Sequence, residues 1–322
     1  MQLLEAVPNL SAGPKSPALQ AVLNALAAAR GACVLHTDGN DDANRTVLTL
    51  AGTPENVLKS LRVLFTAAAE KIDMRAHHGA HPRLGAVDVC PLVPVQNITL
   101  EQAAQYAREL AAFVGEELHI PVYLYEENAA SPARKNLAFL RKGEYESLPE
   151  KLKTLPPDFG PKEFSPHVAQ TGASVIGARN FLIAFNVSLA TQDVQIAKEI
   201  AAKLREKNGG LPGVKAIGWY MENYHCAQVS FNIVDYHKTG LAGVFEACKQ
   251  AAAKYHTDVT AGELIGLLPR EALLQAGQFY APDLPADKQL QAAAEKMLLH
   301  KIRPFYFKER ILEERLADAL QR

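Results

Sequence analysis

The sequence predicts an α+β protein of two ferredoxin-like subdomains of βαββαβ type, whose sheets face each other across a ligand cleft. Three observations support this prediction. The chain of 322 residues is long enough for two domains, strand-like and helix-like apolar patterns alternate along it, and the order βαββαβ occurs once in each half. The expected N-terminal subdomain covers residues 1–175, including a linker over 128–174, and the expected C-terminal subdomain covers 176–322.

The first half alternates strands with helices that begin at recognisable caps. Ser-Pro and Thr-Pro pairs precede two amphipathic runs, and a Thr-x-x-Gln capping box precedes an alanine-rich third one. Between them lie short runs rich in branched and aromatic residues, bounded by turn-forming residues. The predicted elements, in order, are strand 3–10, helix 17–30, strands 32–38 and 45–52, helix 54–71, strand 86–95, helix 99–118 and strand 121–127.

The middle of the chain has a different pattern from the two halves. Residues 128–174 contain prolines, aromatics and charges without a sustained apolar period, which indicates a linker whose side chains could line a site. After it the order βαββαβ returns, and a charged tail with a helical pattern runs from 283 to 322. The predicted elements there are strand 180–189, helix 193–207, strands 214–223 and 226–236, helix 240–255 and strand 262–269.

Composition excludes several classes of partner. The 34 basic and 35 acidic residues leave a net charge of −1, so the overall charge favours neither nucleic acid nor an anionic membrane. The N-terminus lacks a basic stretch followed by an apolar one, and no run approaches about 18 apolar residues. We therefore expect a cytoplasmic protein that binds neither nucleic acid nor membrane. Its widely spaced cysteines are expected to be reduced and mostly buried: Cys33, Cys90, Cys226 and Cys248.

The segment RAHHGAHPRLGAVDVCP, residues 75–91, contains three histidines within five positions. His77 and His81 have the i, i+4 spacing of a helical zinc site. However, Gly79 and Pro82 break the helix, and no glutamate beside the first histidine could serve as a base. Loop histidines are more often solvated than bound to metal. The sequence therefore predicts no metal site here.

A single histidine in a rigid loop can instead act as a general base near neutral pH. A carboxylate would orient its ring, and Asp38, Asp73 and Asp88 are the candidates. Asp38 ends the predicted strand 32–38 beside a turn, where capping that turn is its alternative role. Motifs of serine hydrolases, P-loop NTPases and dinucleotide-binding enzymes do not occur in the sequence. Cys90, in the apolar VDVCPL, is expected to be a buried thiol.

Ordered sequence blocks recur over nearly the whole chain. The central block is IDMRAHHGAHPRLGAVDVCPLVPV, preceded by ANRTVLTLAG and followed by PVYLYEE. The others are EAVPNLSAG, RKGEYESLPEKL, PDFGP, GARNFLIAFNVSL, IGWYMEN, AQVSFNIVDY, GELIGLLP and PF-x-x-KERI. Together these blocks resemble the glutamate formiminotransferase family, and their number makes the resemblance more specific than any single motif.

The resemblance implies a transferase of two α/β subdomains facing each other across a ligand cleft, commonly dimeric. Such enzymes transfer the formimino group from N-formimino-L-glutamate to N5 of tetrahydrofolate and release glutamate, in histidine degradation and one-carbon metabolism. Tetrahydrofolate would be a co-substrate, and no metal would be required. By the same resemblance we expect a homodimer. The chain ends after KERILEERLADALQR, so we expect any cyclodeaminase step to belong to a separate protein.

The resemblance also implies the site residues. The catalytic histidine of a His-Pro-Arg triplet is matched by His81, and Asp38 matches the aspartate beside it. Asn44 and Arg45 match an Asn-Arg pair close to the site. After Phe164 the sequence SPHVAQTG is longer than the family's loop, so the pterin contacts are expected to differ there. The implied substrate contacts are Asn44, Arg45, Phe159, Gly160, Pro161, Lys162, Glu163, Phe164 and Gly172.

The residue types suit this chemistry. N5 of tetrahydrofolate is a weakly basic amine that attacks an amidine carbon, so a base must remove its proton and the leaving glutamate nitrogen must regain one. One histidine can do both in turn while an aspartate holds its tautomer. The candidates for binding the substrate carboxylates are Arg45, Arg83, Arg179 and Lys162, and Trp219 is a candidate for stacking on the pterin.

Three alternatives remain open from the sequence. A glutamate formyltransferase that uses 5-formyltetrahydrofolate would employ the same His81 and Asp38. A non-catalytic folate-binding subunit could dock a cyclodeaminase, although the presence of both residues argues against it. A metal-dependent amidohydrolase would use the histidine cluster and would lose its activity on treatment with a chelator.

Overall fold

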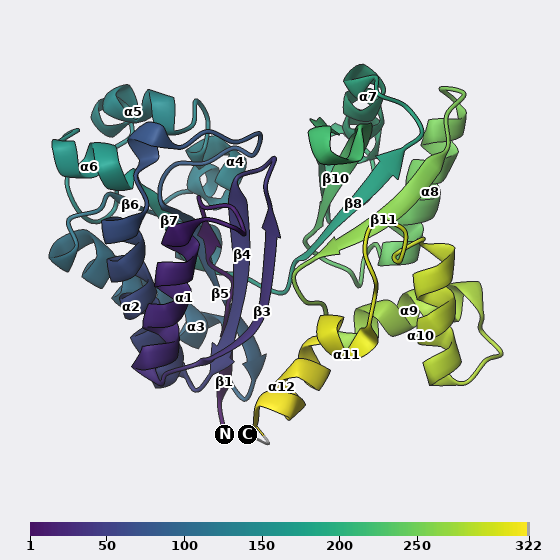
Figure 1. The fold of residues 1–322 in the computed structure, drawn as a ribbon, viewed down its shortest axis with the longest axis horizontal. Helices are drawn as coiled ribbons and strands as arrows, with labels where there is room; N and C mark the ends of the chain where they lie inside the picture. The colour runs from purple at the N-terminus through teal and green to yellow at the C-terminus, as the bar shows by residue number, and fades with distance from the viewer. Residues whose placement is uncertain (321–322) are drawn as a thin grey trace. The chain divides into compact units, whose positions relative to one another are not determined.

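The computed structural model describes residues 1–320 and confirms the α+β class. The chain divides into two compact units, residues 1–180 and the residues from Phe181 on. Each unit contains one sheet with helices packed against it (Figure 1). The candidate residues of the histidine segment all lie in the first unit.

The sheet of the first unit is antiparallel except at one edge. Its strands are β1 (Leu3–Ala6), β2 (Asn9–Leu10), β3 (Cys33–Asn40), β4 (Arg45–Gly52), β5 (Val87–Gln96), β6 (Val122–Leu124) and β7 (Ser174–Ala178). β4 pairs with β3 on one side and with β1 and β2 on the other, and these two pair with β5. β7 is parallel to both β5 and β6. The β3–β4 register pairs Asn40 with Arg45, which places Arg45 at the end of this hairpin.

Three long helices pack on this sheet: α1 (Pro17–Ala29), α2 (Pro54–Lys71) and α3 (Leu100–Ala112). Their predicted caps are confirmed, because the Ser16 side chain accepts a hydrogen bond at the start of α1 and Thr99 and Gln102 form a capping box on α3. Their apolar faces pack into the core, where Leu61 and Phe65 of α2, for example, are fully buried. Burial of each such side chain contributes roughly 1.5–3 kcal/mol. The 3-10 or π turns of this part are η1 (Met74–Ala76), η2 (Phe113–Glu117) and η3 (Glu126–Asn128).

Residues 128–174 correct the expectation of a linker. They form η4 (Pro132–Lys135), α4 (Leu137–Leu140), η5 (Tyr145–Ser147), α5 (Leu148–Thr154) and α6 (Pro166–Thr171). Leu140, Leu148 and Val168 are fully buried in a cluster with Tyr123 and Val175 of the sheet. Each helical piece is too short to display a 3.6-residue period, so burial comes from contacts with the sheet rather than from a local pattern.

The second unit has a four-stranded antiparallel sheet in the order β11, β8, β10, β9, formed by β8 (Ile183–Leu189), β9 (Val214–Met221), β10 (Cys226–Ile233) and β11 (Val259–Ile265). Phe185, Phe231 and Phe245 lie in its core. The strands agree with the sequence pattern, whereas α9 was not predicted. The helical elements are α7 (Val194–Leu204), η6 (Glu206–Asn208), η7 (Glu222–Tyr224), α8 (Leu241–Ala253), α9 (Arg270–Tyr280), α10 (Ala286–Lys296), α11 (Phe307–Arg310) and α12 (Leu312–Leu320).

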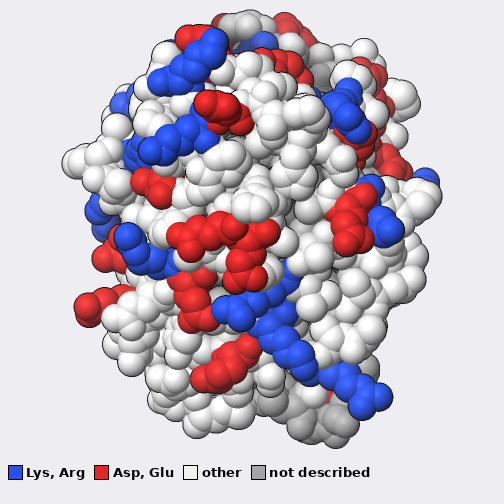
Figure 2. All heavy atoms as spheres, turned by 90° about the vertical axis from the view of Figure 1, so that its left-hand side faces the viewer, with Lys and Arg blue, Asp and Glu red and all other residues white. Residues whose placement is uncertain are grey.

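The surface carries charges of both signs. On the face drawn in Figure 2, acidic and basic side chains are interspersed. Between residues 1 and 320, no helix combines the length and the apolar character needed to cross a bilayer.

Candidate active site

The three histidines lie on a non-helical loop between η1 and β5, residues 77–85, which we call the histidine loop. It packs on the turn between β3 and β4. The Ala80 N–H donates to the Asp42 carbonyl at 3.0 Å, and Asn44 Nδ2 donates to the His78 carbonyl at 2.8 Å. His77 Nε2 lies 2.9 Å from the Asn44 carbonyl oxygen. The turn therefore fixes the backbone of the loop through several bonds.

Asn44 is the residue of the turn that makes most of these bonds. Its φ of 44° lies in the left-handed region, which asparagine tolerates better than other side chains. The side-chain oxygen accepts from the Gly13 N–H at 2.9 Å while the amide nitrogen donates to the loop. Asn44 thus links the first strands, the turn and the histidine loop, so it positions the site; its contact with substrate stays a prediction.

Gly79 allows the loop to lie directly against the turn. A Cβ at this position would come within 2.3 Å of the Ala43 carbonyl oxygen. We expect Gly79→Ala to destabilise the protein by about 1–3 kcal/mol, because backbone on both sides must move. Gly243→Ala in α8, where the nearest atom is 3.7 Å away, is expected to stabilise by about 0.5–1 kcal/mol. Urea unfolding of both variants checks this pair, and equal midpoints would contradict the close packing.

His81 is a half-buried residue whose ring is oriented by its own neighbour. Nδ1 lies 2.8 Å from the Pro82 carbonyl oxygen, which can only accept, so the neutral ring carries its proton on Nδ1 and Nε2 is the basic nitrogen. Burial, then the positive charges of Arg45 and Arg141, hold the pKa of His81 well below its usual value of 6.5. The imidazole is therefore neutral at pH 7 and can accept a proton.

Arg45, Asp88 and Arg141 form a buried charge cluster beside the histidine loop. Arg45 Nη1 donates to Asp88 Oδ2 at 2.7 Å, and Arg141 contacts both carboxylate oxygens of Asp88. Asp88 Oδ1 also accepts from the Leu84 N–H at 2.9 Å, which anchors the loop. Arg45 is oriented further by Asn9 Oδ1, to which Nη2 donates at 2.7 Å.

The protonation of this cluster follows from burial and charge. Burial would raise the pKa of Asp88, but the two guanidinium groups outweigh it and lower that pKa to about 2. Burial lowers the pKa of Arg45 to about 10, against the opposing influence of Asp88. At neutral pH Asp88 and Arg45 are therefore both charged.

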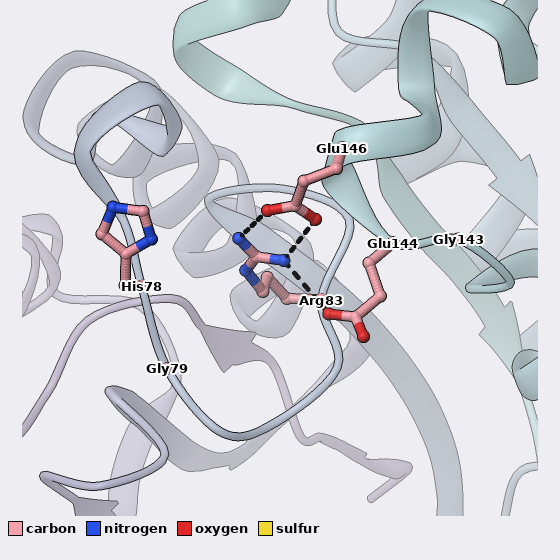
Figure 3. A pocket seen from close by; sticks show the side chains of 6 residues that line it. All are labelled: His78, Gly79, Arg83, Gly143, Glu144 and Glu146. Carbon is pink, nitrogen blue, oxygen red and sulfur yellow. Dashed lines mark hydrogen bonds and ion pairs between the residues drawn. The ribbon is translucent and has the colours of Figure 1, made fainter.

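Arg83 is held by acidic partners from η5 and its N-cap. Figure 3 shows its guanidinium between Glu146 and Glu144, with Nη2 at 2.5 Å and Nη1 at 3.1 Å from their respective oxygens. Nε also donates to His77 Nδ1 at 3.4 Å. These residues, with His78, Gly79 and Gly143, line an open pocket of about 400 Å³. The predicted carboxylate-binding role of Arg83 is therefore opposed by two carboxylates of the protein itself.

The three candidate aspartates lie in different surroundings. Asp38, on β3, is buried, with Oδ2 3.6 Å from His36 Nε2. Asp73 accepts from the backbone and side chain of Arg75 at the start of η1. Asp88 belongs to the charge cluster whose groups influence the pKa of His81. The pairing of Asp38 with His81 stays a prediction.

The segment predicted to contact folate has two parts. Gly172, with φ of 68°, ends α6 and pairs with Gly85 of the histidine loop, where a Cβ would come within 2.3 Å of the Leu84 carbonyl oxygen. Phe159 instead pairs with Val122 of β6. Its neighbour Pro161 is half-buried, and Gly160, with φ of 82°, packs on Ile120. The side chains of Lys162, Glu163 and Phe164 are exposed.

Two further candidates have partners inside their own units. Arg179 donates to the Asn180 carbonyl at 3.0 Å. Trp219, on β9, donates to Gln228 Oε1 at 2.9 Å and is half-buried. Cys90 is buried as expected, while Cys33 is exposed and Cys226 half-buried, so fewer thiols are buried than the sequence suggested.

The residue that sequence reasoning missed is Arg141. It directly follows α4, which begins at the Asn136 cap and buries Leu140. The sequence offered one signal for Arg141: it is the first residue of the ordered block RKGEYESLPEKL. The same block contributes the two glutamates that contact Arg83. The sequence alone does not indicate that this block packs near the histidine loop; the tertiary contacts of Arg141 with Asp88 and of Glu146 with Arg83 show it.

The fold and this site define an α+β protein of two units, with a candidate general base, His81, beside a buried charge cluster in the first unit. Residues 3–179 match the formiminotransferase domain, N-terminal subdomain, and residues 184–317 match the formiminotransferase domain. The chain belongs to the formiminotransferase family.

Individual relatives extend over most of this chain. It is 41% identical to the formimidoyltransferase-cyclodeaminase of Sus scrofa over 99% of its length, but spans only 60% of that protein. It is 38% identical to the glutamate formimidoyltransferase of Streptococcus pyogenes serotype M1 and 39% identical to that of Thermoplasma acidophilum, covering 93% and 92% of those proteins.

Proposed function

We propose that this protein transfers the formimino group from N-formimino-L-glutamate to N5 of tetrahydrofolate, giving 5-formiminotetrahydrofolate and L-glutamate. The observation that carries the proposal is His81: a neutral imidazole with its proton on Nδ1, on a loop fixed by Asn44 and Asp88. The relatives named glutamate formimidoyltransferase support the same reaction.

The proposed reaction needs one base that later returns its proton. N5 attacks the amidine carbon and forms the new C–N bond, while His81 Nε2 removes the N5 proton. The tetrahedral intermediate then breaks its bond to the glutamate nitrogen, which takes the proton from the imidazolium. Tetrahydrofolate serves as co-substrate, and aligning both substrates lowers the barrier by removing their translational freedom.

Asp38 is proposed to stabilise the imidazolium that forms during transfer. We expect Asp38→Asn to lower kcat about tenfold or more with a smaller change in KM, because the charge acts only on the protonated ring. Steady-state kinetics check this. An unchanged kcat would contradict a role for Asp38 in stabilising the imidazolium.

Folate is proposed to use the exposed part of the predicted segment. Phe164 keeps 40% of its surface exposed beside Lys162 and Glu163, so an aromatic ring and a cation are available to a pterin or a glutamyl tail. Phe159, Gly160, Pro161 and Gly172 would shape the same segment through their backbone contacts.

Each unit is proposed to be a ferredoxin-like subdomain. In the second unit the elements follow the order βαββαβ along the chain, and the sheet order is β11, β8, β10, β9. The first strand of the unit, β8, thus lies between the last strand, β11, and the third strand, β10, which supports the proposal. In the first unit β5, β1, β4 and β3 follow the same order, with β7 and β6 added beyond β5.

A steady-state assay of chelator-treated protein tests the proposed function. N-formiminoglutamate and tetrahydrofolate are supplied, and 5-formiminotetrahydrofolate is followed after acid conversion to the methenyl form. Turnover is the expected result. Reaction of 5-formyltetrahydrofolate with glutamate, without formimino transfer, would assign a formyltransferase instead.

A further inference from the structure

The chemistry of the donor favours a cation close to the base. In N-formimino-L-glutamate the nitrogen that leaves is bonded to the Cα that carries the α-carboxylate. This carboxylate therefore reaches the site within a few bonds of the amidine carbon. The glutamyl tail of folate, in contrast, is separated from N5 by the p-aminobenzoyl group. A guanidinium beside His81 suits the donor's α-carboxylate better than the folate tail.

Two of the arginines in this region are already engaged. Arg83 faces both Glu144 and Glu146, so its immediate surroundings carry an excess of negative charge. Arg45 donates hydrogen bonds from Nε and Nη2 to Asn9 Oδ1 and from Nη1 to Asp88 Oδ2. Neither presents an open edge for a substrate carboxylate.

Arg141 differs from both. Nε and Nη2 contact the two oxygens of Asp88, while Nη1 donates to none of residues 1–320 that the structure describes. Its side chain remains 14% exposed, whereas Asp88 is fully buried. Two guanidinium groups share this one carboxylate, which leaves one net positive charge in the cluster. Through Asp88 and Leu84, the cluster is tied to the loop three residues after His81.

We propose that Arg141 binds the α-carboxylate of the formimino donor and so sets the leaving nitrogen beside His81. This inference rests on the proposed function. Asp88 accepts hydrogen bonds from two nitrogens of the Arg141 guanidinium and thereby fixes the plane of this group. The exposed edge that carries Nη1 is therefore oriented before the substrate binds. The carboxylate then neutralises the excess positive charge of the cluster.

Arg141→Gln tests the proposal, with Arg134→Gln as its matched control. Arg134 lies in the same segment, pairs with Asp158 at 2.8 Å and is 13% exposed, but belongs to a different cluster. For Arg141→Gln we expect KM for N-formiminoglutamate to rise about tenfold to a hundredfold, with KM for tetrahydrofolate unchanged. Arg134→Gln should leave both near the wild-type values.

The dependence of kcat/KM on pH distinguishes loss of the Arg141 charge from a simple loss of packing. The positive charge of Arg141 lowers the pKa of His81, after the larger effect of burial. Its removal should therefore shift the acid limb of kcat/KM to higher pH, while Arg134→Gln should not. Removal of Arg141 leaves Asp88 paired with Arg45, so the fold should survive. If Arg141→Gln does not fold, Arg141→Lys keeps the charge, and an intermediate rise in KM for the donor is expected.

Calorimetric titration with L-glutamate, the product, separates this inference from the proposed function. If the wild-type protein shows no formimino transfer, the proposed function fails alone. Tighter binding of L-glutamate by wild type than by Arg141→Gln, by about tenfold, would still support Arg141. The inference would be overturned if wild type and Arg141→Gln bound L-glutamate equally well. It would also be overturned if Arg141→Gln left KM for the donor unchanged or raised only KM for tetrahydrofolate.

Discussion

Replacing His81 by alanine is expected to lower kcat for formimino transfer by about a hundredfold to ten-thousandfold, because no base remains to take the N5 proton. KM should change little, since the imidazole acts on the reacting atoms rather than on the bound carboxylates. Steady-state kinetics with both substrates, together with circular dichroism of the folded variant, measure this effect. Partial rescue of kcat by added imidazole would identify the missing group as the base.

His78→Ala is the matched control for this experiment. His78 lies three residues away on the same loop, its side chain is exposed, and its bond to Asn44 uses only the backbone carbonyl. The control should keep near-wild-type kcat. A value of kcat for His81→Ala within a few-fold of wild type would remove His81 from the chemistry.

Asp88→Asn is expected to reduce the free energy of unfolding by about 3–5 kcal/mol, because the buried guanidinium of Arg45 and the half-buried one of Arg141 lose their shared counter-charge. Asp158→Asn is the control: Asp158 pairs with a single arginine and is 14% exposed, so a smaller loss is expected. Urea unfolding measures both. Adding Arg141→Gln to Asp88→Asn should restore part of the stability, since one of the two uncompensated charges is removed. Equal losses in the two single variants would contradict the role of the cluster.

The acid dependence of stability provides a second measurement on Asp88. Its pKa is about 2 in the folded protein, below the usual 3.8. The unfolded chain therefore binds the proton more readily, and Asp88 stabilises the fold above about pH 4. That contribution, about 2 kcal/mol, is lost as the pH falls from about 4 to 2. In Asp88→Asn the slope of stability against pH over this range should be correspondingly flatter.

Much of the fold was predictable because its signals are local. The helix caps at Ser16 and Thr99 satisfy the first backbone N–H groups of their helices, and the alternation of apolar residues marks the strands, so a few neighbouring residues are sufficient. The short helices of residues 128–174 were missed because their burial depends on Tyr123 and Val175 rather than on their own period. β7 was missed with them.

The site divides in the same way. The sequence by itself determined that residues 77–85 form a loop, since Gly79 and Pro82 cannot continue a helix, and its ordered blocks identified the family and singled out His81. Only the tertiary structure decided which charges meet around that histidine. Arg45 and Arg141 lie 43 and 53 residues from Asp88, and Glu146 lies 63 residues from Arg83. Strand register and the packing of α4 bring these groups together, and no local pattern of charge in the chain specifies such long-range pairing.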